Sequence, residues 1–219
     1  MRPDTTVVAG IDVGGERKGF HAVALRGREV IDKLASPDPH AIADWCRSVG
    51  REGAQAVGVD APCRWSRSGG SRQAERELMR AGIHCFFSPT RAAAERHPRN
   101  YYGWMLRGAV LYAELEKTHR LYAGEGATSP PRQPACFETF PQAIACALAG
   151  RIVAARDKRA VRKRLLEEAG IDTAPFTNID WIDAALCALA AQAFVAGRVR
   201  VYGEAGEGVI VLPVGGRRS

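Results

Sequence analysis

Two aspartates of this chain end apolar stretches, and a turn follows each of them. Asp12 follows residues 7–11 and precedes two glycines, whereas Asp60 follows residues 56–59 and precedes Ala61 and Pro62. Burying an ionised carboxylate without a partner costs several kcal/mol, and a second like charge nearby raises that cost. A divalent cation between the two removes both penalties, so the pair indicates a metal site. Each aspartate could instead cap the loop that follows it, because Asp is common at such turns.

Two further acids lie in apolar surroundings. Glu138 alternates with apolar residues in a predicted strand, where a side chain facing solvent is not expected. Asp183 lies near the start of a predicted helix over residues 178–196 that is almost wholly apolar beyond it. Asp180 lies one turn earlier on the same face, where it is either a further ligand or a cap that interacts with the helix dipole. For Glu138 the alternative is an ion pair with an arginine of the basic helices.

Taken together, Asp12, Asp60, Glu138 and Asp183 supply four hard oxygen ligands. Such ligands suit Mg2+ or Mn2+, which bind carboxylates, water and substrate phosphate. Two such ions about 4 Å apart can orient a water nucleophile and stabilise the leaving oxygen of a phosphodiester. The sequence therefore predicts these four residues as both catalytic and metal-ligating, with Asp180 as an additional candidate ligand.

Basic residues supply the groups that could hold a phosphate backbone. Arg17 and Lys18 follow the glycine turn within reach of Asp12, and Lys158 begins a basic stripe that continues through residues 162–164. We expect Arg17, Lys18 and Lys158 to contact substrate phosphates without reading sequence, although the stripe over 162–164 is equally typical of a solvated helix face. His21 could assist proton transfer or could simply be packed in its strand. The formal charge of +7 is compatible with a polyanionic partner.

The order of predicted elements explains how the acids come together. Strands over residues 6–13, 19–25 and 29–34 are joined by short turns, which favour antiparallel pairing. A helix over 40–49 then leads to a buried strand over 55–60, and a right-handed crossover can place that strand beside the first one. Residues 61–134 are predicted to be a helical insertion, with helices over 71–79 and 100–122. A strand over 135–140, helices over 142–148, 158–169 and 178–196, and a small hairpin over 202–212 complete the chain.

Length and composition exclude several classes of protein. At 219 residues the chain is predicted to be a single domain over 1–219. The longest apolar stretch, residues 184–196, is shorter than the ~20 residues of a membrane helix, and no apolar signal segment precedes the first strand. Six scattered cysteines form no Cys-x-x-Cys pair, which is typical of free thiols rather than a zinc site. We therefore expect a cytoplasmic protein that does not contact membranes.

These motifs resemble the family catalogued as domain of unknown function 429, whose members are described as predicted nucleases of ribonuclease H-like fold. The resemblance rests on G-I-D-V-G-G-E-R-K-G-F at residues 10–20, V-G-V-D-A-P at 57–62, F-E-T-F-P at 137–141 and I-D-W-I-D-A-A-L-C-A-L-A-A at 179–191. It implies an α/β fold, with a five-stranded mixed sheet whose first three strands are antiparallel and helices on both faces. It also implies an acidic active site, in which Asp12, Asp60 and Glu138 are the first-, fourth- and fifth-strand acids and Asp183 is the helix acid.

Three functions remain open at this point. The first is a metal-dependent nuclease that uses two Mg2+ or Mn2+ ions to hydrolyse DNA or RNA. The second is a non-catalytic module of the same fold that binds nucleic acid or protein. The third is an actin-like phosphotransferase, because such kinases also begin with an aspartate and a glycine-rich turn, but they need two lobes and this chain has room for one. The sequence specifies neither the type of nucleic acid nor the oligomeric state.

Overall fold

The structure is a computed structural model that describes residues 5–124 and 133–215. Its strands form one mixed sheet in the order β3 (Glu29–Ser36), β2 (Phe20–Arg26), β1 (Val7–Val13), β4 (Ala56–Asp60), β6 (Ala135–Glu138), β8 (Gly208–Pro213) and β7 (Val199–Glu204). A two-residue strand, β5 (Arg120–Leu121), pairs with β6 beside this path.

The first three strands are an antiparallel meander, as expected from their short turns. β4 returns beside β1 in parallel register after α1 (Pro39–Ser48), and this register sets Asp12 directly opposite Asp60. The predicted adjacency of the two aspartates is therefore confirmed. Because the two strands are parallel, both residues lie at the carboxyl end of the sheet.

The expectation of five strands is wrong, because the described residues form an eight-stranded sheet. The predicted hairpin over 202–212 is not a separate appendage: β8 pairs in parallel with β6, opposite Glu138. The hydroxyl of Thr139 reinforces this contact by donating a hydrogen bond to the carbonyl of Val211 at 2.7 Å. Alternation along the hairpin predicts two strands. Their pairing with β6 is a tertiary contact that no local sequence signal predicts.

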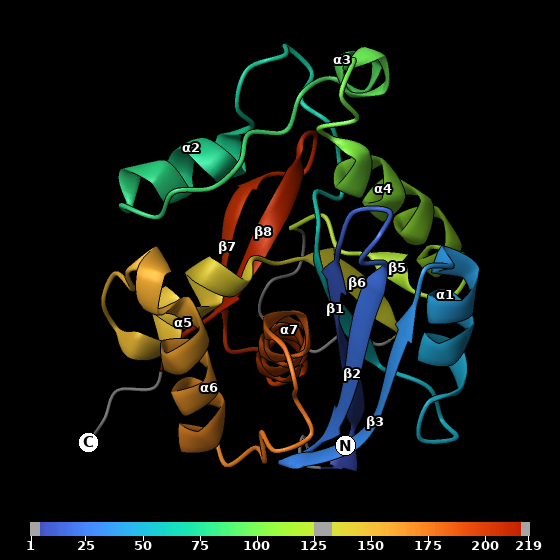
Figure 1. Cartoon of the computed structure of the whole chain (residues 1–219), viewed down its shortest axis with the longest axis vertical. Helices are drawn as coiled ribbons and strands as arrows, with labels where there is room; N and C mark the ends of the chain where they lie inside the picture. The colour runs from blue at the N-terminus through green and yellow to red at the C-terminus, as the bar shows by residue number, and fades with distance from the viewer. Residues whose placement is uncertain (1–4, 125–132, 216–219) are drawn as a thin grey trace.

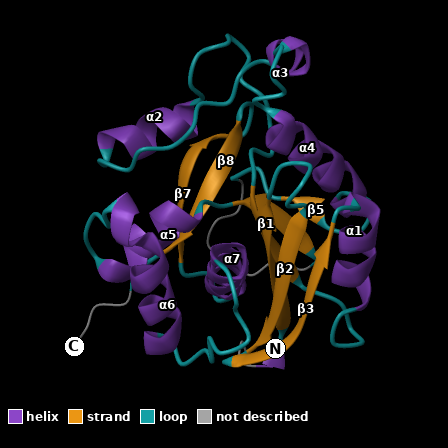
Figure 2. Cartoon of the chain, in the orientation of Figure 1, coloured by secondary structure: helices purple, strands orange, loops and turns teal. Residues whose placement is uncertain are grey.

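Helices cover both faces of the sheet (Figure 1). One face carries α7 (Ile179–Val195), α5 (Pro141–Ala149) and α6 (Lys158–Glu168), and the other carries α1 and α4 (Gly103–Leu115). Figure 2 shows β1, β2 and β3 between α7 and α1. A short 3-10 turn, η2 (Ala155–Asp157), precedes α6.

The segment between β4 and β6 contains α2 (Gln73–Arg80), α3 (Arg91–Arg96), α4 and β5. The predicted helix over 71–79 is found as α2, but the one over 100–122 is shorter and ends at Leu115. There the backbone N–H of His119 donates to the carbonyl of Leu115, and the chain turns into β5. Residues 125–132 of the predicted insertion lie outside the described residues.

Two glycines allow α7 to lie directly on the sheet. A Cβ at Gly10 would lie 2.1 Å from the carbonyl oxygen of Ala184, and one at Gly58 would lie 2.6 Å from that of Cys187. Each glycine precedes a candidate aspartate by two residues, so glycine and aspartate share a face of the strand. The same close contact therefore sets the first turns of α7 over Asp12 and Asp60.

Within the described ranges, no helix combines the length and apolar character needed to cross a membrane.

Candidate metal centre

The carboxylates of Asp12 and Asp60 lie in an environment that opposes their ionisation. Burial, followed by the charges of Asp183 and Asp180, raises the pKa of Asp12 from 3.8 to about 7. Burial, followed by the charges of Asp12 and Asp183, raises the pKa of Asp60 well above its usual value. Like charges act on one another in this way only at short range. The predicted set is therefore brought together for Asp12, Asp60 and Asp183.

The first turn of α7 supplies the helix acids. The Asn178 side chain caps the helix by accepting from the backbone N–H of Trp181 at 3.0 Å. Asp180 consequently has its side chain free for other contacts, and its carboxylate binds the Lys18 ammonium at 2.9 Å. The sequence left Asp180 as either a metal ligand or a helix cap. The cap is made by Asn178 instead.

Asp183 is buried and is held by an arginine. Its side chain is 11% exposed, and the Arg162 guanidinium donates a short hydrogen bond to Asp183 Oδ1. Arg162 also donates to Gln142 Oε1 at 2.9 Å, which fixes its position from α5. Burial still raises the pKa of Asp183, although Arg162 opposes the shift. Arg162 thus holds in place a carboxylate whose charge raises the pKa of both Asp12 and Asp60.

The interpretation of residues 162–164 as one solvated stripe is wrong for Arg162, which is buried. It holds for Lys163 and Arg164, which are exposed and face Glu167 and Glu168 one turn later at 3.7 and 3.6 Å. Lys158, the first residue of α6, is exposed, and its charge lowers the pKa of Asp183. Arg17 is exposed beside Lys18 in the turn after β1. Lys18 and Lys158 therefore border the carboxylates, and all three phosphate contacts stay predictions.

His21 is a member of the site that the sequence analysis did not identify as a ligand. The β1–β2 register places it opposite Asp12, and one ligand atom each from Asp12, His21 and Asp180 lie within 4.8 Å of one another. Its Nδ1 is buried without a hydrogen-bond partner in the described part of the chain, and its ring packs edge-on against Trp181 with centroids 4.7 Å apart. The tight turn at 14–19 is the signal that could have revealed it, since it pairs residue 12 with residue 21.

These residues fit a divalent cation. Burial lowers the pKa of His21, so the imidazole is neutral and keeps a lone pair for a metal. Two carboxylates beside an unpaired imidazole nitrogen are a recognised donor set, and the imidazole suits first-row transition metals better than it suits Mg2+. One bound cation would give Nδ1 of His21 a partner and would also reduce the repulsion between the carboxylates.

Glu138 is near Asp60, whose pKa its charge helps to raise and with which it lines one small cleft, but it lies on the other face of the sheet from Asp12 and Asp183. In the β4–β6 register it is opposite Val59, so alternation directs it to the face away from Asp60 and α7. Its oxygens accept from the Arg72 guanidinium at 2.8 and 2.5 Å, and from the backbone N–H of Cys63 at 2.8 Å. Glu138 therefore forms an ion pair with an arginine, as the alternative interpretation of the sequence expected, and the partner is Arg72. Its predicted role as a metal ligand stays a prediction that this geometry disfavours.

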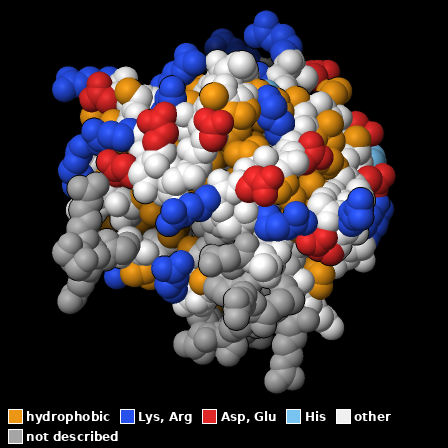
Figure 3. Space-filling view, turned by 90° about the horizontal axis from the view of Figure 1, so that it is seen from below, with side chains coloured by type: hydrophobic (Ala, Val, Ile, Leu, Met, Phe, Trp, Pro, Cys, Tyr) orange, Lys and Arg blue, Asp and Glu red, His pale blue; other side chains and the backbone are white. Residues whose placement is uncertain are grey.

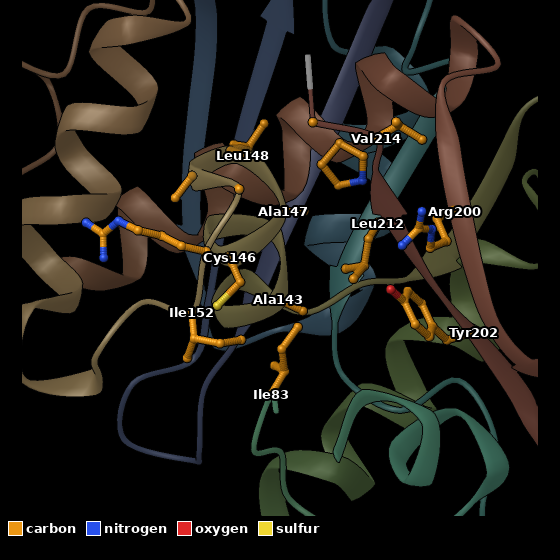
Figure 4. A pocket seen from close by; sticks show the side chains of 15 residues that line it. Ile83, Ala143, Cys146, Ala147, Leu148, Ile152, Arg200, Tyr202, Leu212 and Val214 are labelled. Carbon is orange, nitrogen blue, oxygen red and sulfur yellow. The ribbon is translucent and has the colours of Figure 1, made fainter. Parts of the chain in front are cut away.

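A larger cavity lies elsewhere on the molecule. It has a volume of about 640 Å³ and is lined mainly by apolar side chains of α5, of the β7–β8 hairpin and of the loop after α5 (Figure 4). None of the predicted site residues lines it. The carboxylates at the carboxyl end of the sheet therefore remain the candidate site.

Comparison with known proteins identifies the family. The chain belongs to the family described as "Protein of unknown function (DUF429)", which matches residues 10–207. The resemblance seen in the motifs is thus confirmed over most of the chain. No curated protein matches the sequence.

Among solved structures, the chain is similar to RuvC from Thermus thermophilus. One RuvC structure is 17% identical, with 88% of this chain and 96% of that chain covered and a TM-score of 0.43. A second, in complex with a Holliday junction substrate, is 20% identical, with 91% and 99% covered and a TM-score of 0.44.

Proposed function

We propose that this member of the DUF429 family is a nuclease of ribonuclease H-like fold that hydrolyses nucleic-acid phosphodiester bonds with two bound Mg2+ or Mn2+ ions. The observation that carries the proposal is the group of mutually perturbed carboxylates of Asp12, Asp60 and Asp183 at one edge of the sheet. Asp180 and His21 complete the donor set. The antiparallel meander, the parallel β4 and the helices on both faces agree with the proposed fold.

The residues divide into three roles. Asp12 is the central ligand, because its carboxylate interacts with Asp60 on one side and with the acids of α7 on the other. Arg162 keeps Asp183 in place, while Lys18, Arg17 and Lys158 bind the phosphates of the substrate. The bound cations would supply a Lewis acid and an activated water. Lys18 is 61% exposed on its side chain, so it can exchange Asp180 for a phosphate without unfolding its turn.

The test is cleavage of end-labelled single- and double-stranded DNA and RNA in Mn2+. The wild-type chain is expected to cleave at least one of these substrates, and Asp12→Asn is expected to abolish cleavage while its circular dichroism stays unchanged. Asp44→Asn is the matched control, because Asp44 is an exposed aspartate of α1 and should keep full activity. Full activity of Asp12→Asn would refute the proposal, as would a wild-type chain that cleaves none of the substrates.

The non-catalytic module is the second candidate, and one observation favours it. Arg162 and Arg72 already neutralise Asp183 and Glu138, which leaves fewer negative charges for a pair of ions than four free acids would. This candidate predicts nucleic-acid binding that is unaffected by Mn2+. An actin-like phosphotransferase predicts tight ATP binding in calorimetry, and the single sheet of the described residues gives it no second lobe.

A further inference from the structure

Exposed aromatic side chains gather near the start of α4. The Phe86 side chain is 63% exposed, and its ring packs edge-on against Trp104, with centroids 6.2 Å apart. Tyr101, one turn before Trp104, is 53% exposed and packs against Tyr102 with centroids 4.9 Å apart. Large aromatic groups left exposed together mark a binding surface more often than they mark a fold requirement. We call Phe86, together with the partly buried Trp104 that it contacts, the aromatic platform.

The aromatic platform adjoins the candidate metal centre. Asp60, Phe86 and Trp104 line one small cleft at the carboxyl end of the sheet, together with the Arg72–Glu138 ion pair. Asp60 is a proposed ligand, so a group stacked on Phe86 would lie next to the proposed site of cleavage. Both members of this ion pair are almost fully buried.

Exposed arginines lie in the segment that leads into α4. Arg96 ends α3, Arg99 lies between α3 and α4, and both are exposed. By contrast, the face on the far side of the molecule, seen in Figure 3, mixes Lys and Arg with Asp and Glu side chains. Exposed aromatic rings combined with exposed arginines are typical of proteins that hold single-stranded nucleic acid, since bases stack on the rings and the cations follow the backbone.

We infer that the aromatic platform stacks an unpaired base of the substrate, so that the substrate class is nucleic acid with unpaired nucleotides near the cleaved bond. This inference rests on the proposed nuclease function and narrows it. In an intact duplex each base is already stacked between its neighbours, and its ring face is not available to Phe86. Single strands, overhangs and branch points offer free ring faces and are bound in preference to blunt duplex.

The test measures binding separately from cleavage. Fluorescence anisotropy is recorded with a dye-labelled oligothymidylate and with a blunt duplex of the same length, on a chain carrying Asp12→Asn so that neither probe is cut. Adding Phe86→Ala is expected to weaken binding of the single strand about tenfold, and binding of the duplex by less than about twofold. Phe86→Trp is expected to restore single-strand binding. Because Phe86 is mostly exposed, its replacement leaves the core intact, and the melting temperature checks this.

Ile152→Ala is the matched control, since Ile152 is also a large exposed apolar residue, 53% exposed, but lines the distant cavity of Figure 4. It is expected to change neither affinity. Equal loss of affinity for both probes, or no loss for either, would overturn the aromatic platform. The two proposals can fail separately. If cleavage depends on Asp12 but single-strand binding does not change in Phe86→Ala, only the inference about the aromatic platform is refuted. If single-strand binding depends on Phe86 but the wild-type chain cleaves no substrate, only the nuclease proposal is refuted.

Discussion

Asp12 titrates near neutrality because burial and two neighbouring acids oppose its ionisation. A carboxylate in this condition is poised to exchange its proton for a metal ion, since the cation removes the same repulsion that raises its pKa. Asp60 and Asp183 share the condition. Without a metal ion, the protein therefore keeps mutually repelling carboxylates close together at the carboxyl end of its sheet.

Stability of the metal-free chain should depend on this charge. The folded pKa of Asp12, about 7, lies above the value of 3.8 expected in the unfolded chain, so the folded state binds the proton more tightly. The resulting stabilisation is fully present below pH 3.8 and is lost as the pH rises through about 7. Asp12→Asn should remove most of this loss and raise the free energy of unfolding at pH 8 by on the order of 2 kcal/mol.

Urea unfolding in EDTA at pH 5 and pH 8 measures this difference, with Asp44→Asn as the control that should follow the wild type. If Asp12→Asn and the wild type lost equal stability between these pH values, the assigned environment of Asp12 would be incorrect.

Glu138 should behave in the opposite way from Asp12. Replacing Glu138 by Gln removes one of the two buried carboxylates that pair with the Arg72 guanidinium and leaves only Glu75, which should lower the free energy of unfolding by about 1.5–3 kcal/mol. The rise in melting temperature caused by Mn2+ should persist in this variant, whereas Asp12→Asn should lose it.

Denaturant unfolding and thermal shift in Mn2+ separate these roles. A Glu138→Gln chain that is as stable as the wild type but no longer responds to Mn2+ would make Glu138 a ligand, as the sequence first suggested.

Residue types and their places in strands and helices were enough to predict that Asp12, Asp60 and Asp183 lie near one another. Their partners were not predictable, because Arg162 is close to Asp183 only through the packing of α6 on α7, and Arg72 reaches Glu138 across 66 residues. Periodicity identifies which face of a helix is apolar. It does not identify which arginine will fold back into the core.

At the scale of elements, the site depends on how closely α7 approaches β1 and β4. Gly10 and Gly58 are opposite one another in register, and each meets the backbone of α7. The small residues of α7, such as Ala184 and Ala188, complete this contact. The acids of α7 reach the strand acids because no side chain separates helix and sheet at these points.

Gly10→Ala tests this contact. Its Cβ would overlap the backbone at Ala184 and Ala188, so α7 must move outward, which should lower the free energy of unfolding by about 3 kcal/mol. The same movement should weaken the Mn2+ response, since it takes Asp183 away from Asp12. Gly15→Ala is the control: nothing lies within 4 Å of its Cβ, and it should leave stability nearly unchanged.

Unfolding by urea, with and without Mn2+, gives both quantities. A Gly10→Ala chain with wild-type stability would show that α7 does not need this close approach.

Most elements could be predicted from their turns and periodicity, including the meander, β4 and α7. The position of β8 in the sheet could not be predicted, because its pairing with β6 brings together residues 138 and 210, which are distant in sequence. The glycines were seen only as part of apolar strands, since their role depends on a helix that packs on them from elsewhere in the chain.

At the scale of the whole molecule, the chain places its candidate chemistry at one edge of the sheet. The acids of β1, β4 and α7 lie at the carboxyl ends of the strands, and the aromatic platform adjoins Asp60 at the same edge. The positive excess of +7 is not gathered on the far face, where both signs are mixed (Figure 3). The proposed catalytic groups and the proposed substrate contact at Phe86 therefore lie at the same end of the sheet.

The central claim is that Asp12, Asp60 and the acids of α7 bind divalent cations. Anomalous scattering from crystals soaked in Mn2+ tests it most directly, because it locates manganese without reference to activity. The account predicts anomalous peaks between Asp12, Asp60 and Asp183, and none in a crystal of Asp12→Asn soaked in the same way. Manganese bound only at other sites, or an Asp12→Asn crystal with the same peaks, would contradict it.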